Sequence, residues 1–222
     1  IRDRYINMLK KSEQKRKNGN HPKKNQILGV YPQVVLATLS ETRIEMFKAT
    51  GIPFIMEPHK VDEKKIKRTK FCQQKERLAT TLAEAKARSI EKDHPNKIIV
   101  GSDQILICEG KLLSKPENVE EAERNLQILA GKNHTLWSSV IAVKTGSIYF
   151  SIRKKARIQL KDLSKKEIQN YISVNKNTVL SCVGSYRIED NEKYGYIKVL
   201  SGEEETIKGF PIQKFISILK SK

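Results

Sequence analysis

Acidic residues are scarce in this chain of 222 residues, which contains 25 Asp and Glu against 43 Lys and Arg and has a formal net charge of +18. Such an excess has two interpretations. It is typical of proteins that bind nucleic acid, and it also occurs as a lysine-rich surface on enzymes with anionic substrates. The basic residues are spread along the chain, and no RNP-like, helix-turn-helix or zinc-finger pattern is present. The absence of these motifs favours the second interpretation.

Cysteines and long apolar runs are also few. Cys72, Cys108 and Cys182 are an odd number without close spacing, which indicates neither a disulfide framework nor a zinc site. No apolar run approaches the roughly 20 residues that span a bilayer. The start of the chain lacks the apolar segment of a secretory signal. The sequence therefore predicts a cytoplasmic protein without a membrane partner.

The first 33 residues differ in composition from the rest. They contain nine Lys and Arg, two acidic residues and few periodic apolar positions. We interpret residues 1–33 as a flexible basic extension, either an arm that binds nucleic acid or an upstream segment without that role. Residues 34–222 are expected to form one globular domain.

Apolar periodicity in residues 34–222 alternates between the two regular periods. Strands are predicted at 34–37, 54–56, 98–101, 105–108, 136–143, 148–152, 157–160 and 194–200, and helices at 41–50, 74–92, 118–129, 164–173 and from Pro211 to near Leu219. GSDQ at 101–104 is interpreted as a polar turn. Because strands and helices alternate early and hairpins follow, the pattern predicts an α/β fold with a mixed sheet and a cleft.

The segment VVLATLSETR at 34–43 has the pattern of an anion pocket. An apolar strand leads into a Ser/Thr turn and then a helix. The first N–H groups of a helix lack internal partners, and the helix dipole is positive there. Ser40 fits the N-cap position, Thr38 adds a hydroxyl, and Arg43 adds a fork of donors. These three residues are candidate phosphate ligands.

Three further charged residues are candidates for the same site. Asp103 lies between two runs of β-branched residues, where a carboxylate would reach the rim of a sheet, although an Asx turn is an equal alternative. Lys86 is surrounded by alanines that allow close approach, and Lys115 precedes Pro116, which favours an extended backbone. For both lysines the alternative is an ordinary solvated side chain.

Two other segments have open interpretations. Asp62-Glu63 would suit a hard divalent cation, or Asp62 would cap a helix. His134 is either a substrate ligand or a hydrogen-bonded structural residue. Trp137, the only tryptophan, would stack on a base or pack against the sheet.

Taken in order, these residues resemble the Maf family of nucleoside triphosphate pyrophosphatases from about residue 34 to 219. The matching motifs are Leu36-Ala37-Thr38-Leu39-Ser40 with Arg43, Asp62-Glu63, Leu82-Ala83-Glu84-Ala85-Lys86-Ala87, Gly101-Ser102-Asp103, Lys115-Pro116, Leu129-Ala130-Gly131-Lys132-Asn133-His134, Gly184-Ser185-Tyr186 and Gly209-Phe210-Pro211. Among the departures, Thr38 replaces a serine, and Asp190 stands where the family has glycine.

The resemblance implies a mixed twisted sheet flanked by helices, in two lobes around a central cleft. It implies hydrolysis of the bond between the α and β phosphates, with Asp103 as general base. Mg²⁺ or Mn²⁺ would be held near Glu63 and Asp103. The triphosphate would be bound by Thr38, Ser40, Arg43, Lys86, Lys115 and His134.

Glu189 is the residue expected to select the base. Family members resembling the dTTP and UTP branch have Gln at this position, whereas those resembling the 7-methyl-GTP branch have Glu. A carboxylate suits the adjacent N1–H and N2–H donors of guanine and the positive charge of an N7-methylated ring. The alternative is a structural ion pair with Arg187 or Lys193.

Two other functions stay open at this point. The charge and residues 1–33 allow a nucleic-acid-binding protein on a catalytically weakened Maf scaffold, whose affinity would fall steeply with salt. The family's older association with septum formation allows a role in division control. A homodimer is an open alternative to a monomer.

Overall fold

The computed structural model describes residues 31–70 and 75–221. The predicted basic extension lies almost entirely outside them, and its flexibility stays a prediction. Within the described ranges, seven strands form one mixed sheet in the order β2-β1-β3-β5-β6-β7, with β4 also pairing with β3. The strands are β1 (Val34–Ala37), β2 (Phe54–Glu57), β3 (Ile98–Cys108), β4 (Lys111–Leu113), β5 (Asn133–Lys144), β6 (Ser147–Leu160) and β7 (Ile197–Ser201).

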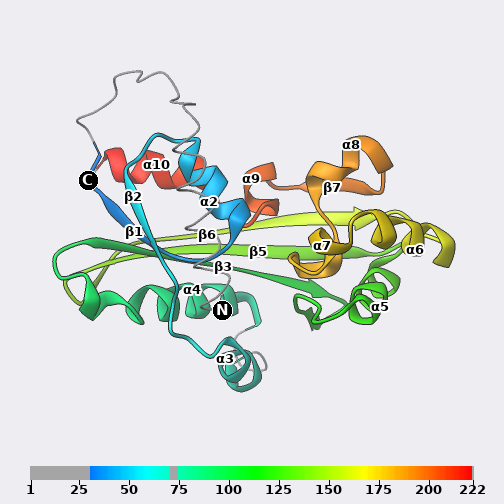
Figure 1. Ribbon diagram of the computed structural model, residues 1–222, viewed down its shortest axis with the longest axis horizontal. Coiled ribbons are helices and arrows are strands. Elements are labelled where there is room, and N and C mark those ends of the chain that lie inside the picture. Colours follow the sequence, from blue (N-terminus) through cyan, green and yellow to red (C-terminus); the bar gives the residue numbers. More distant parts are fainter. Residues whose placement is uncertain (1–30, 71–74, 222) are drawn as a thin grey trace, which may run out of the picture.

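Helices flank the sheet on both faces (Figure 1). They are α2 (Glu41–Lys48), α3 (Glu63–Lys70), α4 (Leu78–Arg88), α5 (Val119–Leu129), α6 (Lys165–Val174), α7 (Lys176–Val179), α8 (Asn191–Tyr194), α9 (Glu204–Ile207) and α10 (Ile212–Lys220). β1, β2 and the start of β3 run parallel, and the other pairings are antiparallel. This architecture confirms the predicted α/β class and mixed sheet.

The apolar core is divided between the two ends and the two faces of the sheet. Phe47 of α2 and Phe215 of α10 pack on one face, with ring centroids 5.1 Å apart, against the strands around β1. On the opposite face α4 packs against β1, β3 and β5. At the far end of the sheet, α5 and α6 enclose a third cluster around Leu106 and Leu136.

The prediction of a turn at GSDQ was wrong. β3 continues through Gly101–Gln104, and β5 pairs with it along the whole stretch from Ile99 to Cys108. A Cβ at Gly101 would lie 2.0 Å from the Ala83 carbonyl oxygen, so only glycine permits α4 to approach this closely. The glycine that suggested a turn instead allows a helix to contact a strand.

β6 is likewise one strand of 14 residues rather than the two that were predicted. Its residues alternate between buried and exposed as far as Leu160, and the polar stretch that separated the two predicted strands is paired with β5 throughout. The predicted capping box is confirmed, because the Ser164 side chain accepts from the Glu167 N–H and the Glu167 carboxylate accepts from the Ser164 N–H.

α3 was missed because the helix is strongly polar and has little apolar periodicity to detect. Asp62 caps it, since its carboxylate accepts a hydrogen bond from the Lys65 N–H at 3.0 Å. Among residues 31–70 and 75–221, no helix has both the length and the apolar character needed to cross a bilayer.

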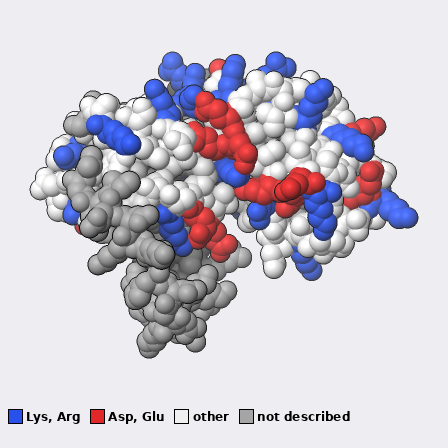
Figure 2. All heavy atoms as spheres, turned by 90° about the horizontal axis from the view of Figure 1, so that it is seen from above, with Lys and Arg blue, Asp and Glu red and all other residues white. Residues whose placement is uncertain are grey.

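The surface seen from above carries no single basic patch. Figure 2 shows Lys and Arg side chains scattered around the rim of this face, while acidic side chains gather near its middle. On this face, the charge excess is therefore dispersed.

Candidate active site

The candidate site is created by a gap along one edge of β3. The first three residues of β3 pair with β1 on that edge, and its last three, Leu106–Cys108, pair with β4. Between them, residues 101–105 have no strand partner on that edge among the described residues. The chain leaving β1 enters α2 through Ser40, and the chain leaving β4 passes through Lys115. Both segments therefore border the gap.

A cavity of about 880 Å³ occupies this gap, a volume in the range of small-molecule sites. Charged side chains dominate its lining, with seven basic and five acidic residues. The basic ones are Arg43, Lys64, Lys67, Lys86, Lys115, Arg187 and Lys208, and the acidic ones are Glu63, Asp103, Glu117, Glu121 and Glu189. The excess of positive charge suits a polyanionic ligand.

Lys86 and two carboxylates form the centre of the site. The Lys86 Nζ lies 2.5 Å from Asp103 Oδ1 and 2.8 Å from Glu63 Oε1. Lys86 and Asp103 side chains are each only 6% exposed, and the close contact between Gly101 and α4 brings them together. The second Asp103 oxygen, Oδ2, is buried. The arrangement leaves this carboxylate oxygen of Asp103 without a hydrogen-bond partner among the described residues.

Glu63 is ionised more readily than an ordinary glutamate. Burial on its own would raise the Glu63 pKa, but the hydrogen bond from His59 and the positive charges of Lys86 and Lys67 lower that pKa well below its usual range. Glu63 is consequently an anion throughout the physiological pH range.

Arg43 connects α2 to two neighbouring segments. Its Nη1 donates to the Ser102 carbonyl oxygen at 2.9 Å, and its Nε donates to the Gly209 carbonyl oxygen at 3.2 Å. Burial lowers the Arg43 pKa, while the charges of Asp103 and Glu63 oppose this shift. The guanidinium is therefore fixed in direction at the wall of the cavity.

Lys115 has no ion pair or hydrogen bond with any residue in the described parts of the chain. Loss of hydration, together with repulsion from Arg43 and Lys86, lowers its pKa. Its side chain lines the cavity and is exposed. A lysine beside two other cations and without a carboxylate partner would be stabilised by an anion placed among the three.

Glu189 also lines the cavity, in the loop between Tyr186 and α8, where Ile188–Asp190 form one 3-10 turn. Its Oε2 is 3.5 Å from the Arg187 Nε, so the expected alternative of an ion pair with Arg187 is present in the structure. The side chain is still 30% exposed. Glu189 can therefore face a ligand while retaining its basic neighbour.

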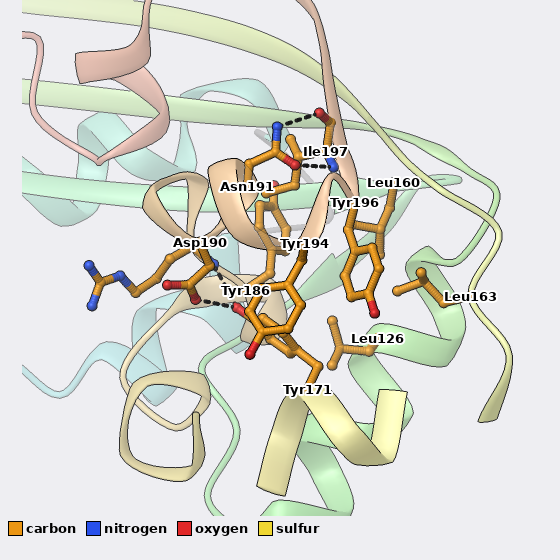
Figure 3. Close-up of a pocket in the computed structure, with 11 residues that line it drawn as sticks. Leu126, Leu160, Leu163, Tyr171, Tyr186, Asp190, Asn191, Tyr194, Tyr196 and Ile197 are labelled. Atoms are coloured by element: carbon orange, nitrogen blue, oxygen red, sulfur yellow. Dashed lines mark hydrogen bonds between the residues drawn. The ribbon is translucent and has the colours of Figure 1, made fainter. Parts of the chain in front are cut away.

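A group of tyrosines packs around Asp190 and Asn191, the two residues that follow Glu189 in this loop (Figure 3). The Tyr171 hydroxyl donates to Asp190 Oδ2 at 2.6 Å, and the Asn191 side chain bonds both backbone polar groups of Ile197. Tyr194 packs edge-on against Tyr171, with centroids 5.0 Å apart. Asp190, which departs from the family's glycine, thus has a structural partner.

Two predicted substrate ligands lie outside the cavity lining. His134 is 3% exposed and its Nε2 is 2.6 Å from the Tyr186 hydroxyl, while burial lowers its pKa to about 4. This geometry matches the structural alternative for His134. Thr38 is also buried, and its hydroxyl accepts from the Ser40 N–H at 3.1 Å. Ser40 does line the cavity, and its hydroxyl makes no capping bond to α2.

The donor set for a metal consists of two carboxylates. In residues 31–70 and 75–221, no group of three or more His, Cys, Asp and Glu is arranged to hold a metal ion. Asp103 and Glu63 approach the same ammonium group from two sides, and Asp103 Oδ2 is unpartnered. This donor set fits Mg²⁺, which commonly takes one or two protein carboxylates and completes its shell with water and phosphate oxygens.

Several lining residues were not identified from the sequence. Lys67 reaches Glu63 from the missed helix α3, and Lys208 follows α9. Gln104 donates to the Thr206 and Ile207 carbonyl oxygens at 2.9 Å, which fixes α9 against β3. Only the polarity of Gln104 between two apolar runs gave a signal, and it was attributed to a turn.

The chain shares sequence with proteins of known name over most of its length. It is 33% identical to the nucleoside triphosphate pyrophosphatase of Pelagibacter ubique over 193 residues, covering 85% of this chain and 97% of that protein. It is 31% identical to the 7-methyl-GTP pyrophosphatase of Bartonella henselae over 179 residues, covering 81% and 90% of the two chains. The profile of the family described as Maf-like protein matches residues 33–222. The chain belongs to the Maf-like protein family.

Proposed function

We propose that this protein is a nucleoside triphosphate pyrophosphatase that releases a nucleoside monophosphate and pyrophosphate. One observation carries the proposal: Arg43, Lys86 and Lys115 converge on a single cavity beside an unpartnered oxygen of Asp103. Its relatives in Pelagibacter ubique and Bartonella henselae bear names of this activity.

Asp103 is the general base in this proposal. Its Oδ1 is held by Lys86, so the free Oδ2 would accept a proton from a water that attacks the α-phosphate. A fixed carboxylate orients that water as well as deprotonating it, and both effects lower the barrier.

The cations position the triphosphate and offset its charge. Lys115, which has no carboxylate partner, and Arg43, which is fixed by two carbonyl oxygens, would face the phosphate oxygens. Ser40 offers an uncommitted hydroxyl at the start of α2. Donors fixed in advance stabilise the negative charge that develops in the transition state without reorganising.

Asp103 and Glu63 would hold a divalent cation, Mg²⁺ or Mn²⁺. Such an ion neutralises phosphate charge and polarises the bond that breaks. The depressed pKa of Glu63 keeps it in the ionised form that a hard cation requires.

Glu189 would read the base, and a 7-methylated guanine is the preferred candidate. The carboxylate accepts from both donors on the guanine edge, whereas a pyrimidine offers one donor and one acceptor at the equivalent positions. Arg187 is already 3.5 Å from Glu189, which partly offsets the gain from a positively charged ring. We expect preference for guanine over pyrimidines to exceed preference for the methylated form.

A pyrophosphate-release assay across dTTP, UTP, CTP, GTP and 7-methyl-GTP, with Mg²⁺ or Mn²⁺, tests this function. Asp103→Asn should reduce kcat about 10²–10⁴-fold while nucleotide binding, followed by calorimetry, is retained. Asp162→Asn, in an exposed loop, is the matched control and should leave turnover unchanged.

If none of the five nucleotides releases pyrophosphate, the proposal is overturned and the nucleic-acid-binding alternative is favoured. Turnover in Asp103→Asn equal to that of the unaltered chain would remove Asp103 from the role of base. The cytoplasmic location stays a prediction.

A further inference from the structure

No helix in the described part of the chain covers one row of side chains on the sheet. α4 covers β1, β3 and β5 on its face of the sheet, but it does not extend over β6. Alternate residues of β6 on that face are exposed, whereas those between them are buried in the clusters of the other face. The row is therefore a consequence of the fold and not of a loop.

The exposed row is strongly basic. Arg153, Lys155 and Arg157 follow each other at alternate positions of β6, about 6.8 Å apart along the strand. Lys198 of β7 is paired with Gln159 and extends the row. All four basic side chains are exposed, and none forms an ion pair with any residue that the structure describes. By contrast, Lys154 on the other face is paired with Glu203.

The only tryptophan of the chain lies beside this row. Trp137 of β5 is directly opposite Lys155 in the sheet register. The Arg153 guanidinium carbon is 5.0 Å from the centre of the indole ring, and the Lys155 Nζ is 5.6 Å from it. Trp137 packs against the apolar residues beneath α4 and is half-buried. An aromatic ring and unpaired cations are thus combined on an open strand face.

We propose that this face, formed by Trp137, Arg153, Lys155, Arg157 and Lys198, binds single-stranded nucleic acid. Regularly spaced cations would follow the phosphates of an extended strand. The indole and the guanidinium plane of Arg153 supply surfaces on which unpaired bases stack, independent of sequence. A duplex would satisfy the cations but keeps its bases inside, so the aromatic component favours a single strand.

The proposed surface is separate from the active site. Arg153 stands in the same row as Asp103, but Ser139 of the intervening strand β5 lies between them and is bonded to Thr80 of α4 at 2.9 Å. α4 therefore separates the two regions. Binding of a strand and hydrolysis of a nucleotide should be independent activities.

Trp137 is a built-in reporter, because no other tryptophan contributes to the emission of the full chain. Titration with oligo-uridine and with oligo-thymidine should quench this emission, with a midpoint that moves to higher concentration as salt is raised. Heparin, a polyanion without bases, should bind without comparable quenching. The two oligonucleotides distinguish RNA from DNA as the source of the strand.

The decisive variants change charge equally at two places. Arg153→Glu with Lys155→Glu should weaken binding of a labelled oligo-uridine by about ten-fold or more, measured by anisotropy. Lys165→Glu with Lys166→Glu, exposed residues at the start of α6, make the same change in net charge and should weaken it by no more than about three-fold. Pyrophosphate release should be unchanged in both, which also reports that they fold.

Equal weakening by the two double variants would overturn the proposal, since it would assign binding to the overall charge or to residues 1–33. An unaltered Trp137 emission at saturating oligonucleotide would overturn it as well. Loss of pyrophosphate release alone would bear on the proposed enzyme and not on this surface.

Discussion

The basic residues on the two sides of α4 differ in burial and in their partners. On the side of the cavity, Lys86 is buried and bonded to two carboxylates. On the other side, Arg153 and Lys155 are exposed, and both lie over the ring of Trp137. A buried charge must be paired because its loss of hydration costs several kcal/mol, whereas an exposed one needs no partner. Burial therefore decides which cations the fold depends on and which are available to a partner.

Removal of the buried cation, Lys86, should lower the free energy of unfolding more than any other change considered below. In Lys86→Met, Asp103 would remain buried without its counter-ion, whereas Glu63, which is 31% exposed, would keep Lys67 and His59. We expect the free energy of unfolding to fall by about 3–5 kcal/mol. Urea denaturation at neutral pH measures the change. Pyrophosphate release should be lost as well.

Lys48→Met is the matched control, because Lys48 and its partner Glu45 are both largely exposed. It should change the unfolding free energy by less than about 1 kcal/mol. Similar losses of unfolding free energy in Lys86→Met and Lys48→Met would show that burial does not decide which cations the fold depends on.

Glu63 should contribute stability that depends on pH. Its folded pKa lies below its ordinary value, so its contribution is complete above the unfolded pKa, near 4.3, and is lost as pH falls through the folded pKa. The difference in unfolding free energy between the unaltered chain and Glu63→Gln should therefore shrink below about pH 4. Urea titrations at pH 7, 5 and 3 measure it, and a difference that grows toward pH 3 would contradict the assignment.

Loss of the hydrogen bonds that hold the Glu189 loop should lower the free energy of unfolding by an intermediate amount. Tyr171→Phe removes the hydroxyl that donates to Asp190 and accepts from the Arg187 N–H, and we expect a loss of about 1–3 kcal/mol in stability. If the loop positions Glu189, KM should rise for guanine nucleotides more than for pyrimidine ones.

Tyr196→Phe keeps the aromatic cluster, and Tyr196 makes no side-chain hydrogen bond with the described residues. It should leave both stability and KM almost unchanged. A uniform fall in kcat without a change in selectivity in Tyr171→Phe would indicate a structural role alone.

The smallest effect is expected on the exposed side. Arg153→Ala should change the unfolding free energy by no more than about 1 kcal/mol, since a surface cation–π contact contributes about that amount. Thermal denaturation measures it. A loss as large as that of Lys86→Met would show that the exposed row is required by the fold.

Much of the candidate site could be predicted because its residues carry local signals. Ser40 follows a strand and precedes a helix, and the alanines beside Lys86 indicated a close approach that the contact with Gly101 confirms. Asp103 was identified as a rim carboxylate even though its segment was assigned to a turn. Residue type and immediate neighbours were sufficient in these cases.

The remainder depends on tertiary contacts that no local pattern encodes. GSDQ is polar and contains glycine, yet β5 supplies a partner along the whole segment. α3 has little apolar periodicity, so Lys67 could not be placed beside Glu63. Histidine is a residue type that often binds ligands, and only the contact of His134 with Tyr186 shows that this side chain faces the interior.

The shared edge of β3 has a consequence for how the molecule tolerates change. Because β1 and β4 end on either side of residues 101–105, the opening exists wherever these two strands pair, whatever the length of the connections that follow them. Insertions after Lys115 or between β1 and α2 would alter the rim without closing the entrance. The strand pairing of the sheet therefore creates the pocket, and the connecting segments around it can change in length and sequence.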